Sequence, residues 1–164
     1  MNDDFSSTNH STLTSVPPFG VGDASYQAAG GLEGITRLVN TFYDIMDSSP
    51  DAAALRVMHA RDLTDSRKKL VYFLSGWMGG PKLYSENYGS ISLPVAHSHL
   101  PVDEATERAW LNCMEQALLA CNYPADFREY MINKLATPAK SIRLMAEFNR
   151  SKPQHPAGVA HPAD

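Results

Sequence analysis

The chain has 164 residues, of which 43% are hydrophobic and 20% charged, and its 14 basic and 18 acidic residues give a formal net charge of -4. This length fits one domain, and the composition is that of a globular protein, which excludes wholesale disorder. The acidic balance argues against a nucleic-acid-binding surface built on bulk charge. We therefore expect no nucleic-acid partner.

The N-terminus begins Met1-Asn2-Asp3-Asp4, acidic where a signal peptide is basic, and no apolar run approaches the roughly 18 residues that span a bilayer. We therefore expect a cytoplasmic protein without a membrane partner. The two cysteines, Cys113 and Cys121, would lie about 12 Å apart on one helix, beyond the reach of a disulfide. Buried free thiols in a reducing compartment are expected.

Composition along the chain predicts three regions. Residues 1–24 are rich in Ser, Thr, Asn and Gly, which is typical of a flexible extension. Residues 151–164 carry three prolines and read as a flexible tail. The helical domain is expected between them, over residues 25–150.

Within this domain, apolar residues recur at helical spacing and no segment shows strand alternation, so the predicted fold is all-α. A short helix capped by Asp23 or Ser25 is expected first, ended by Gly30. The longer predicted helices are, in chain order, Leu32 to Met46, Ala52 to Val57, Asp62 or Thr64 to Trp77, Asp103 to Cys121, and Ala125 to about Arg150, the last through Phe127, Met131, Leu135, Ile142, Met145 and Phe148.

Prolines and glycines mark the breaks between these helices. Gly79-Gly80-Pro81 ends the third long helix, and residues 81–101 are expected to be irregular. Pro138 should kink the last helix or start a new turn.

Several polar side chains lie on or beside these apolar stripes. His97 stands between Ala96 and Ser98, small residues that leave its ring accessible to a haem iron. Taken alone, a surface or hydrogen-bonded histidine is the simpler interpretation, and His99 is equally plausible by composition. Tyr43 and Trp110 each carry a polar hydrogen that needs a partner when buried, although ordinary core packing also explains them.

Five segments in order carry a resemblance to a known family. They are Phe42-Tyr43-Asp44, Met58-His59-Ala60-Arg61-Asp62-Leu63, Phe73-Leu74-Ser75-Gly76-Trp77-Met78-Gly79-Gly80-Pro81 with Tyr84, His97 ahead of Leu100-Pro101-Val102, and Glu107-Arg108-Ala109-Trp110-Leu111. Together they resemble the truncated haemoglobins, most closely the second group, over roughly Gly30 to Phe148.

The resemblance implies a short, truncated globin-like two-over-two helical sandwich around haem b. His97 falls on the proximal position that ligates the haem iron. Tyr43 and Trp110 fall on positions that donate hydrogen bonds to the bound ligand, and His59 on a third polar position. The residues implied in contact with the cofactor are Phe42, Leu70 and Phe73 as apolar pocket positions, and Tyr84 in the matching segment. The distal histidine of ordinary globins falls on Ser66.

One departure from the family concerns the haem propionates. Relatives commonly carry arginines just before the proximal histidine, where this chain reads Leu93-Pro94-Val95-Ala96. The candidates for anchoring the propionates are therefore Arg67, Lys69, Lys82 and His99.

Three functions remain open from these residues. The first is reversible binding of O2 and of other diatomic ligands, CO and NO. The second is a haem enzyme for nitric-oxide dioxygenation or peroxide chemistry, which would need an external reductase because no flavin or nicotinamide fingerprint occurs. The third is a haem-free helical interaction module that uses the extension or tail as its contact.

Overall fold

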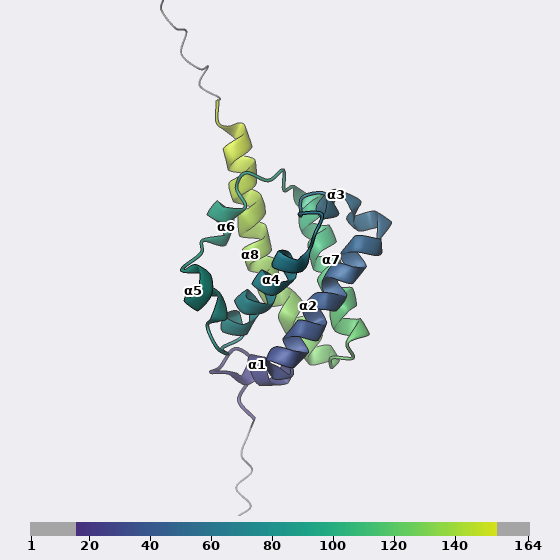
Figure 1. Ribbon diagram of the computed structural model, residues 1–164, viewed down its shortest axis with the longest axis vertical. Helices are drawn as coiled ribbons and strands as arrows, with labels where there is room; N and C mark the ends of the chain where they lie inside the picture. The colour runs from purple at the N-terminus through teal and green to yellow at the C-terminus, as the bar shows by residue number, and fades with distance from the viewer. Residues whose placement is uncertain (1–15, 154–164) are drawn as a thin grey trace, which may run out of the picture.

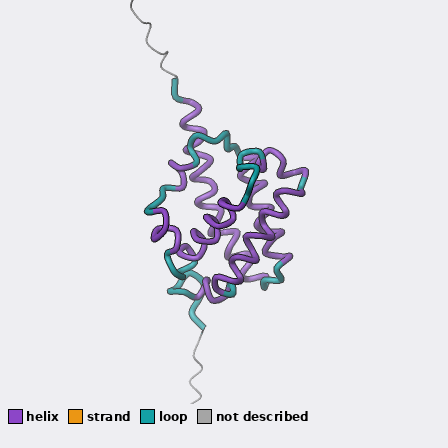
Figure 2. Tube along the Cα trace, viewed as in Figure 1, coloured by secondary structure: helices purple, strands orange, loops and turns teal. Residues whose placement is uncertain are grey.

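The computed structural model describes residues 16–153, and their order of elements follows. It is α1 (Ala24–Ala28), α2 (Gly31–Ser48), the 3-10 helix η1 (Pro50–Ala52), α3 (Ala53–Arg56), α4 (Thr64–Trp77), α5 (Leu83–Tyr88), α6 (Leu93–Ala96), α7 (Glu104–Ala120) and α8 (Ala125–Ser151). These residues contain no strand (Figure 2), which confirms the all-α prediction. None of the helices in this part of the chain is long and apolar enough to cross a membrane.

Two pairs of helices form the two layers of the molecule. Helix α2 packs against α4 in one layer and against α7 in the other, and α7 packs against α8. Figure 1 shows α2 and α4 crossing in front of α7 and α8. Helix α2 supplies much of the core because its apolar residues fall on one stripe; those that are buried are Ile35, Leu38, Val39, Phe42, Tyr43 and Met46.

The start of α7 is fixed by a capping box. The Asp103 carboxylate accepts a hydrogen bond from the Thr106 backbone N–H at 2.9 Å, and the Thr106 hydroxyl accepts one from the Asp103 N–H at 2.9 Å. This confirms the predicted N-cap and places Trp110 in the second turn of the helix. Both cysteines are free thiols: Cys113 is buried, whereas Cys121 is only half-buried.

The predicted irregular stretch over residues 81–101 contains two short helices, α5 and α6. The prediction was wrong here because segments of six and four residues are too short to show a hydrophobic period. Pro94 does not prevent α6, since it lies in the first turn, where its missing N–H has no helical partner to lose. Helix α6 packs against α8 and so holds the segment that leads into His97.

Two predictions concern the last helix, one at Pro138 and one at Phe148. Helix α8 is one element from Ala125 to Ser151, so Pro138 does not start a new helix, although it has no N–H to donate to the carbonyl of Lys134. Phe148, expected on the buried stripe, is 58% exposed. Its exposure follows from the position of the last turns of α8, which extend beyond the other helices (Figure 1).

The residues just before α1 pack onto α8. The Phe19 ring lies 5.3 Å from that of Phe127 and 5.1 Å from that of Tyr130, between centroids. The Gly20 N–H donates to the Ser25 hydroxyl, which donates to the Tyr130 hydroxyl. The inner end of the predicted extension is therefore in contact with the helical domain, whereas residues 1–15 and 154–164 of the predicted extension and tail lie outside the described residues.

Candidate functional site

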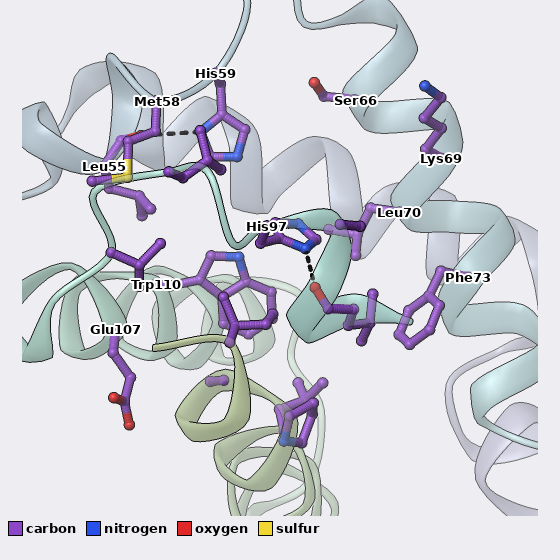
Figure 3. Close-up of a pocket in the computed structure, with 18 of the residues that line it drawn as sticks. Leu55, Met58, His59, Ser66, Lys69, Leu70, Phe73, His97, Glu107 and Trp110 are labelled. Carbon is purple, nitrogen blue, oxygen red and sulfur yellow. Dashed lines mark hydrogen bonds between the residues drawn. The ribbon is translucent and has the colours of Figure 1, made fainter. Parts of the chain in front are cut away.

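A cavity of about 370 Å³ opens between the two helical layers, bounded by α4 and α6 and by α7 and α8 (Figure 3). Such a volume is ordinary for a small-molecule or cofactor site. Its lining is mainly apolar. The lining residues are Tyr43, Leu55, Met58, His59, Ser66, Lys69, Leu70, Phe73, Leu74, Tyr84, Ile91, Leu93, Ala96, His97, Leu100, Val102, Thr106, Glu107, Trp110, Leu135, Pro138, Ala139 and Ile142.

His97 enters the cavity at the C-terminal end of α6. Its Nδ1 lies 2.7 Å from the backbone oxygen of Leu93, the carbonyl four residues earlier, which is close enough for a hydrogen bond (Figure 3). Because a carbonyl oxygen can only accept, the proton is on Nδ1 and the lone pair is on Nε2. This is the tautomer that a metal-ligating histidine needs, with the ring oriented by its other nitrogen.

His59 reaches the same cavity from the connection after α3. Its Nδ1 lies 3.0 Å from the Leu55 carbonyl oxygen, so the lone pair is again on Nε2. Burial lowers the pKa of His59 below its ordinary value of 6.5, and the positive charge of Arg56 lowers it further, while the hydrogen bond to Leu55 opposes the shift. His59 therefore offers the cavity a neutral acceptor rather than a proton.

Tyr43 and Trp110 supply the hydrogen-bond donors of the cavity. Within residues 16–153, neither the Tyr43 hydroxyl nor the Trp110 indole N–H donates to a protein acceptor. In the same residues, every side-chain nitrogen or oxygen that is fully shielded from solvent has a hydrogen-bond partner, so these two groups are not fully shielded. Both groups therefore reach the cavity space. Figure 3 shows the indole nitrogen on the side of the Trp110 ring that faces His97 and His59.

The packing around these two donors fixes their positions. The Trp110 ring lies 5.1 Å from the Phe42 ring, and the Tyr43 ring lies edge-on to the His59 ring at 5.8 Å, between centroids. Burial raises the pKa of Tyr43 to about 12, although the Arg67 guanidinium, 5.7 Å from the ring centroid, lowers it. The phenol consequently keeps its proton at physiological pH and remains a donor.

The cavity brings together most of the residues that the sequence singled out. Those on its wall are Tyr43, His59, Ser66, Lys69, Leu70, Phe73, Tyr84, His97 and Trp110. Phe42 and His99 do not line it: Phe42 is fully buried behind Tyr43 and Trp110, and His99 is exposed.

Of the four propionate candidates, only Lys69 lies on the cavity wall. Arg67 is bound elsewhere, at 2.7 Å from the Asp44 carboxylate and 2.9 Å from the Asn40 carbonyl oxygen. Lys82 and His99 lie outside the lining. Of the four candidates, the one that could meet a haem propionate inside the cavity is therefore Lys69 of α4.

The sequence analysis missed an ion pair at the edge of the cavity. Glu107 lines the cavity and pairs with Arg143 of α8, and both side chains are largely buried, at 15% and 17% exposed. Arg143 also pairs with Glu147. The sequence holds one signal for Glu107: it lies three residues before Trp110 and so shares its face of α7.

Comparison with known proteins shows the family to which this chain belongs. Residues 24–143, most of the chain, match the family of bacterial-like globins. The chain belongs to that family. A group 2 truncated haemoglobin, YjbI of Bacillus subtilis (strain 168), is 33% identical over 120 residues, which cover 73% of this chain and 88% of the relative.

Solved structures support the assignment of this chain to the globin family. A group II 2-on-2 haemoglobin from Agrobacterium tumefaciens superposes with a TM-score of 0.71 at 30% identity, covering 80% of this chain and 98% of that one. A truncated oxygen-avid haemoglobin from Bacillus subtilis gives a TM-score of 0.67 at 32% identity, covering 72% and 97%. The predicted two-over-two globin fold and the resemblance to the second group of truncated haemoglobins are confirmed.

Membership of this family makes the globin a haem-binding truncated haemoglobin. The residues of the cavity fit that cofactor. A porphyrin needs apolar walls and an axial donor, and the cavity offers a largely apolar lining with two imidazoles, those of His59 and His97, whose Nε2 lone pairs face it.

Proposed function

We propose that this globin binds haem b through Nε2 of His97 and holds O2 reversibly against the Tyr43 hydroxyl and the Trp110 indole N–H. The observation that carries the proposal is the contrast between one acceptor and two donors on the cavity wall. His97 presents a lone pair fixed by its hydrogen bond to Leu93, and Tyr43 and Trp110 present two donors that have no protein acceptor within residues 16–153.

The haem, when bound, supplies an iron with one open position for a diatomic ligand, O2, CO or NO. The residues of the chain hold and orient it. The Leu93 carbonyl fixes the His97 ring and increases the donor strength of Nε2. Leu70 and Phe73 provide apolar contact from α4, and Lys69 and Tyr84 are the cavity residues suited to the propionates.

The Tyr43 and Trp110 donors would stabilise O2 more than a ligand that carries little negative charge. O2 held at the haem iron would have additional electron density on its outer oxygen, so each hydrogen bond to it would be charge-assisted and would contribute about 1.5–3 kcal/mol. His59 plays a different part from these two, because its neutral Nε2 accepts rather than donates. It suits the role of holding a proton donor, such as a water, in place.

A second candidate function follows from the same two donors. Hydrogen bonds that slow the release of O2 suit a simple carrier poorly, and they favour consumption of the bound ligand in nitric-oxide dioxygenation or peroxide chemistry with an external cytoplasmic reductase. Mixing the oxygenated protein with nitric oxide in a stopped-flow instrument, and then assaying multiple turnovers with a reductant, separates the two. A single fast reaction without turnover supports binding alone.

The optical spectrum tests the proposal directly. After addition of haemin, the wild-type protein is expected to show a Soret band in its ferric, ferrous and oxygenated forms. His97→Ala should lose the oxygenated spectrum and most of its haem affinity, because it removes the axial donor, whereas His99→Ala should match the wild type. A wild-type protein without a Soret band would contradict haem binding and favour a helical interaction module.

A further inference from the structure

Three tyrosines form a continuous file from the wall of the cavity to the surface of the protein. Tyr84 of α5 lines the cavity, and its ring centroid lies 5.0 Å from that of Tyr88, one turn later on the same helix. The Tyr88 ring lies 6.4 Å from that of Tyr72 on α4. Tyr88, the middle ring of the file, is 43% exposed, so the file reaches solvent at Tyr88.

Core packing accounts for one of the three rings, since Tyr72 packs against the hydrophobic core. It does not account for the other two, because Tyr84 is only half-buried, Tyr88 is exposed, and α5 has no buried residue at all. Rings at these separations are in ordinary aromatic contact, and phenols are among the side chains that give up an electron most readily. A file of touching phenols between a cofactor cavity and solvent is therefore a path along which an electron can move.

Two lysines lie over the outer rings of the file. The Lys69 ammonium is 5.4 Å from the Tyr88 ring centroid, and the Lys68 ammonium is 5.6 Å from that of Tyr72. These cations disfavour a positively charged ring, so an electron must leave together with the phenol proton, which at Tyr88 passes to water. They also attract anions to this face of a chain whose net charge is -4, even though α5 carries Glu86.

We propose that Tyr84, Tyr88 and Tyr72 carry electrons from an anionic phenol, bound at Lys68 beside Tyr72 and Tyr88, to haem that hydrogen peroxide has oxidised. The proposal rests on the haem binding proposed above. Each phenol molecule gives up one electron and its hydroxyl proton and becomes a phenoxyl radical. One H2O2 takes up two electrons and two protons and becomes two waters, with cleavage of its O–O bond, so two phenols are consumed per peroxide.

Without an added phenol, the tyrosines themselves are the donors. Each of two protein molecules then loses one electron and one proton from an exposed tyrosine to the same H2O2. The two radicals couple through a carbon–carbon bond between their rings, which gives a dityrosine-linked dimer and two waters. This product is stable, and it reports where the electron came from.

The test is to treat haem-loaded ferric protein with H2O2 in the presence of a nitroso spin trap, and to map the trapped residue by mass spectrometry. We expect the adduct on Tyr88 or Tyr72. Without the trap, we expect dityrosine fluorescence and a covalent dimer, both lost in Tyr88→Phe with Tyr72→Phe. Tyr130→Phe is the matched control, because Tyr130 packs on Phe19 and Phe127 away from the cavity lining, and it should behave as the wild type.

The role of the Lys68 charge is tested with two phenol substrates of similar size, one anionic and one neutral. Lys68→Gln should raise the KM for 4-hydroxyphenylacetate, which is anionic, and leave that for 4-methylphenol, which is neutral, unchanged. An equal change for both donors would overturn the assigned docking of an anion.

The Soret band of every sample distinguishes a failure of haem binding from a failure of the electron path alone. If the wild type shows no Soret band, haem binding fails and this inference fails with it. If the Soret band is intact and the trap maps to tyrosines outside the file, or the dimer persists in the double variant, haem binding stands and the electron path is wrong.

Discussion

Two histidines that line the cavity are oriented by the same kind of hydrogen bond. In both His59 and His97, Nδ1 is held by the carbonyl oxygen four residues earlier, Leu55 or Leu93, at the end of a short helix. Each of these carbonyls also accepts a backbone hydrogen bond, Leu55 from the Met58 N–H and Leu93 from the His97 N–H. The imidazole adds a second hydrogen bond to the same oxygen, and this contact fixes its tautomer. Both lone pairs then face the cavity, where only one can serve as the proximal ligand.

The donor role of Trp110 predicts a change in ligand release. Trp110→Phe keeps an apolar ring against Phe42 and removes the N–H, so one charge-assisted hydrogen bond to bound O2 is lost. We expect the O2 dissociation rate to rise about tenfold to hundredfold. Stopped-flow displacement of O2 by CO measures it. Trp77→Phe is the control, since Trp77 does not line the cavity, and an unchanged rate in Trp110→Phe would refute the assigned role.

The buried phenol of Tyr43 predicts a pH dependence of stability. Its pKa is raised from 10.0 in the unfolded chain to about 12 in the fold, so the unfolded state loses its proton first. The contribution of Tyr43 to the free energy of unfolding is therefore complete below pH 10 and is lost as the pH rises through 12.

Urea titrations between about pH 9 and 12 measure this loss, which a shift of this size limits to about 3 kcal/mol. Tyr43→Phe should lose less stability over that range than the wild type. It should not abolish the loss, because burial also raises the pKa of Tyr123. Identical slopes in the two proteins would mean that Tyr43 is solvated in the folded state.

At the scale of the elements, the close crossing of α1 and α2 depends on a residue without a side chain. A Cβ on Gly34 would lie 1.9 Å from the carbonyl oxygen of Ala29, a backbone atom that cannot move aside. The Tyr123 hydroxyl donates to that same oxygen, which ties the crossing to the turn after α7.

Gly34→Ala is consequently expected to destabilise the protein by about 1–3 kcal/mol, although alanine favours a helix over glycine. Chemical denaturation measures the difference. Thr36→Ala, an exposed substitution on the same helix, should change the stability by no more than about 0.5 kcal/mol. A stability gain in Gly34→Ala would show that α1 can move away from α2 at little cost.

How far the sequence predicts this molecule differs from one element to the next. The stripes of α2 and α7 are long enough to show their period, and Asp103 marks the start of α7 by its cap. Helices α5 and α6 are shorter than a helix that is stable by itself, and only packing onto α4 and α8 forms them. The hydrogen bond that fixes His97 lies at the end of α6, so the tautomer of the candidate ligand could not be read from the sequence.

At the scale of the whole molecule, contacts between distant parts of the chain fix the helices around the cavity and at the opposite end of α8. The Glu107–Arg143 pair joins α7 to α8 beside the cavity, and the cluster around Phe127 closes the opposite end of α8. Neither contact is visible in the sequence, since each joins residues far apart in the chain. Phe42, implied as a pocket residue, instead supports Tyr43 and Trp110 from behind.

The residues ahead of the family match give the last prediction. Phe19 precedes residues 24–143 and its ring packs against Phe127 and Tyr130. Because the ring is half-buried, Phe19→Ala should lower the free energy of unfolding by about 1–2 kcal/mol, less than a fully buried phenylalanine would. Phe19 does not line the cavity, so the Soret band and the O2 dissociation rate should not change.

Val16→Ala is the matched control for this substitution, because Val16 is 87% exposed, and it should leave the urea midpoint at the wild-type value. If Phe19→Ala also left the midpoint unchanged, the segment before α1 would lie on the surface without stabilising it. If it altered the Soret band instead, the two ends of α8 would be coupled. The physical argument favours a loss of stability without a change at the cavity, because neither Phe127 nor Tyr130, on which the Phe19 ring packs, lines the cavity.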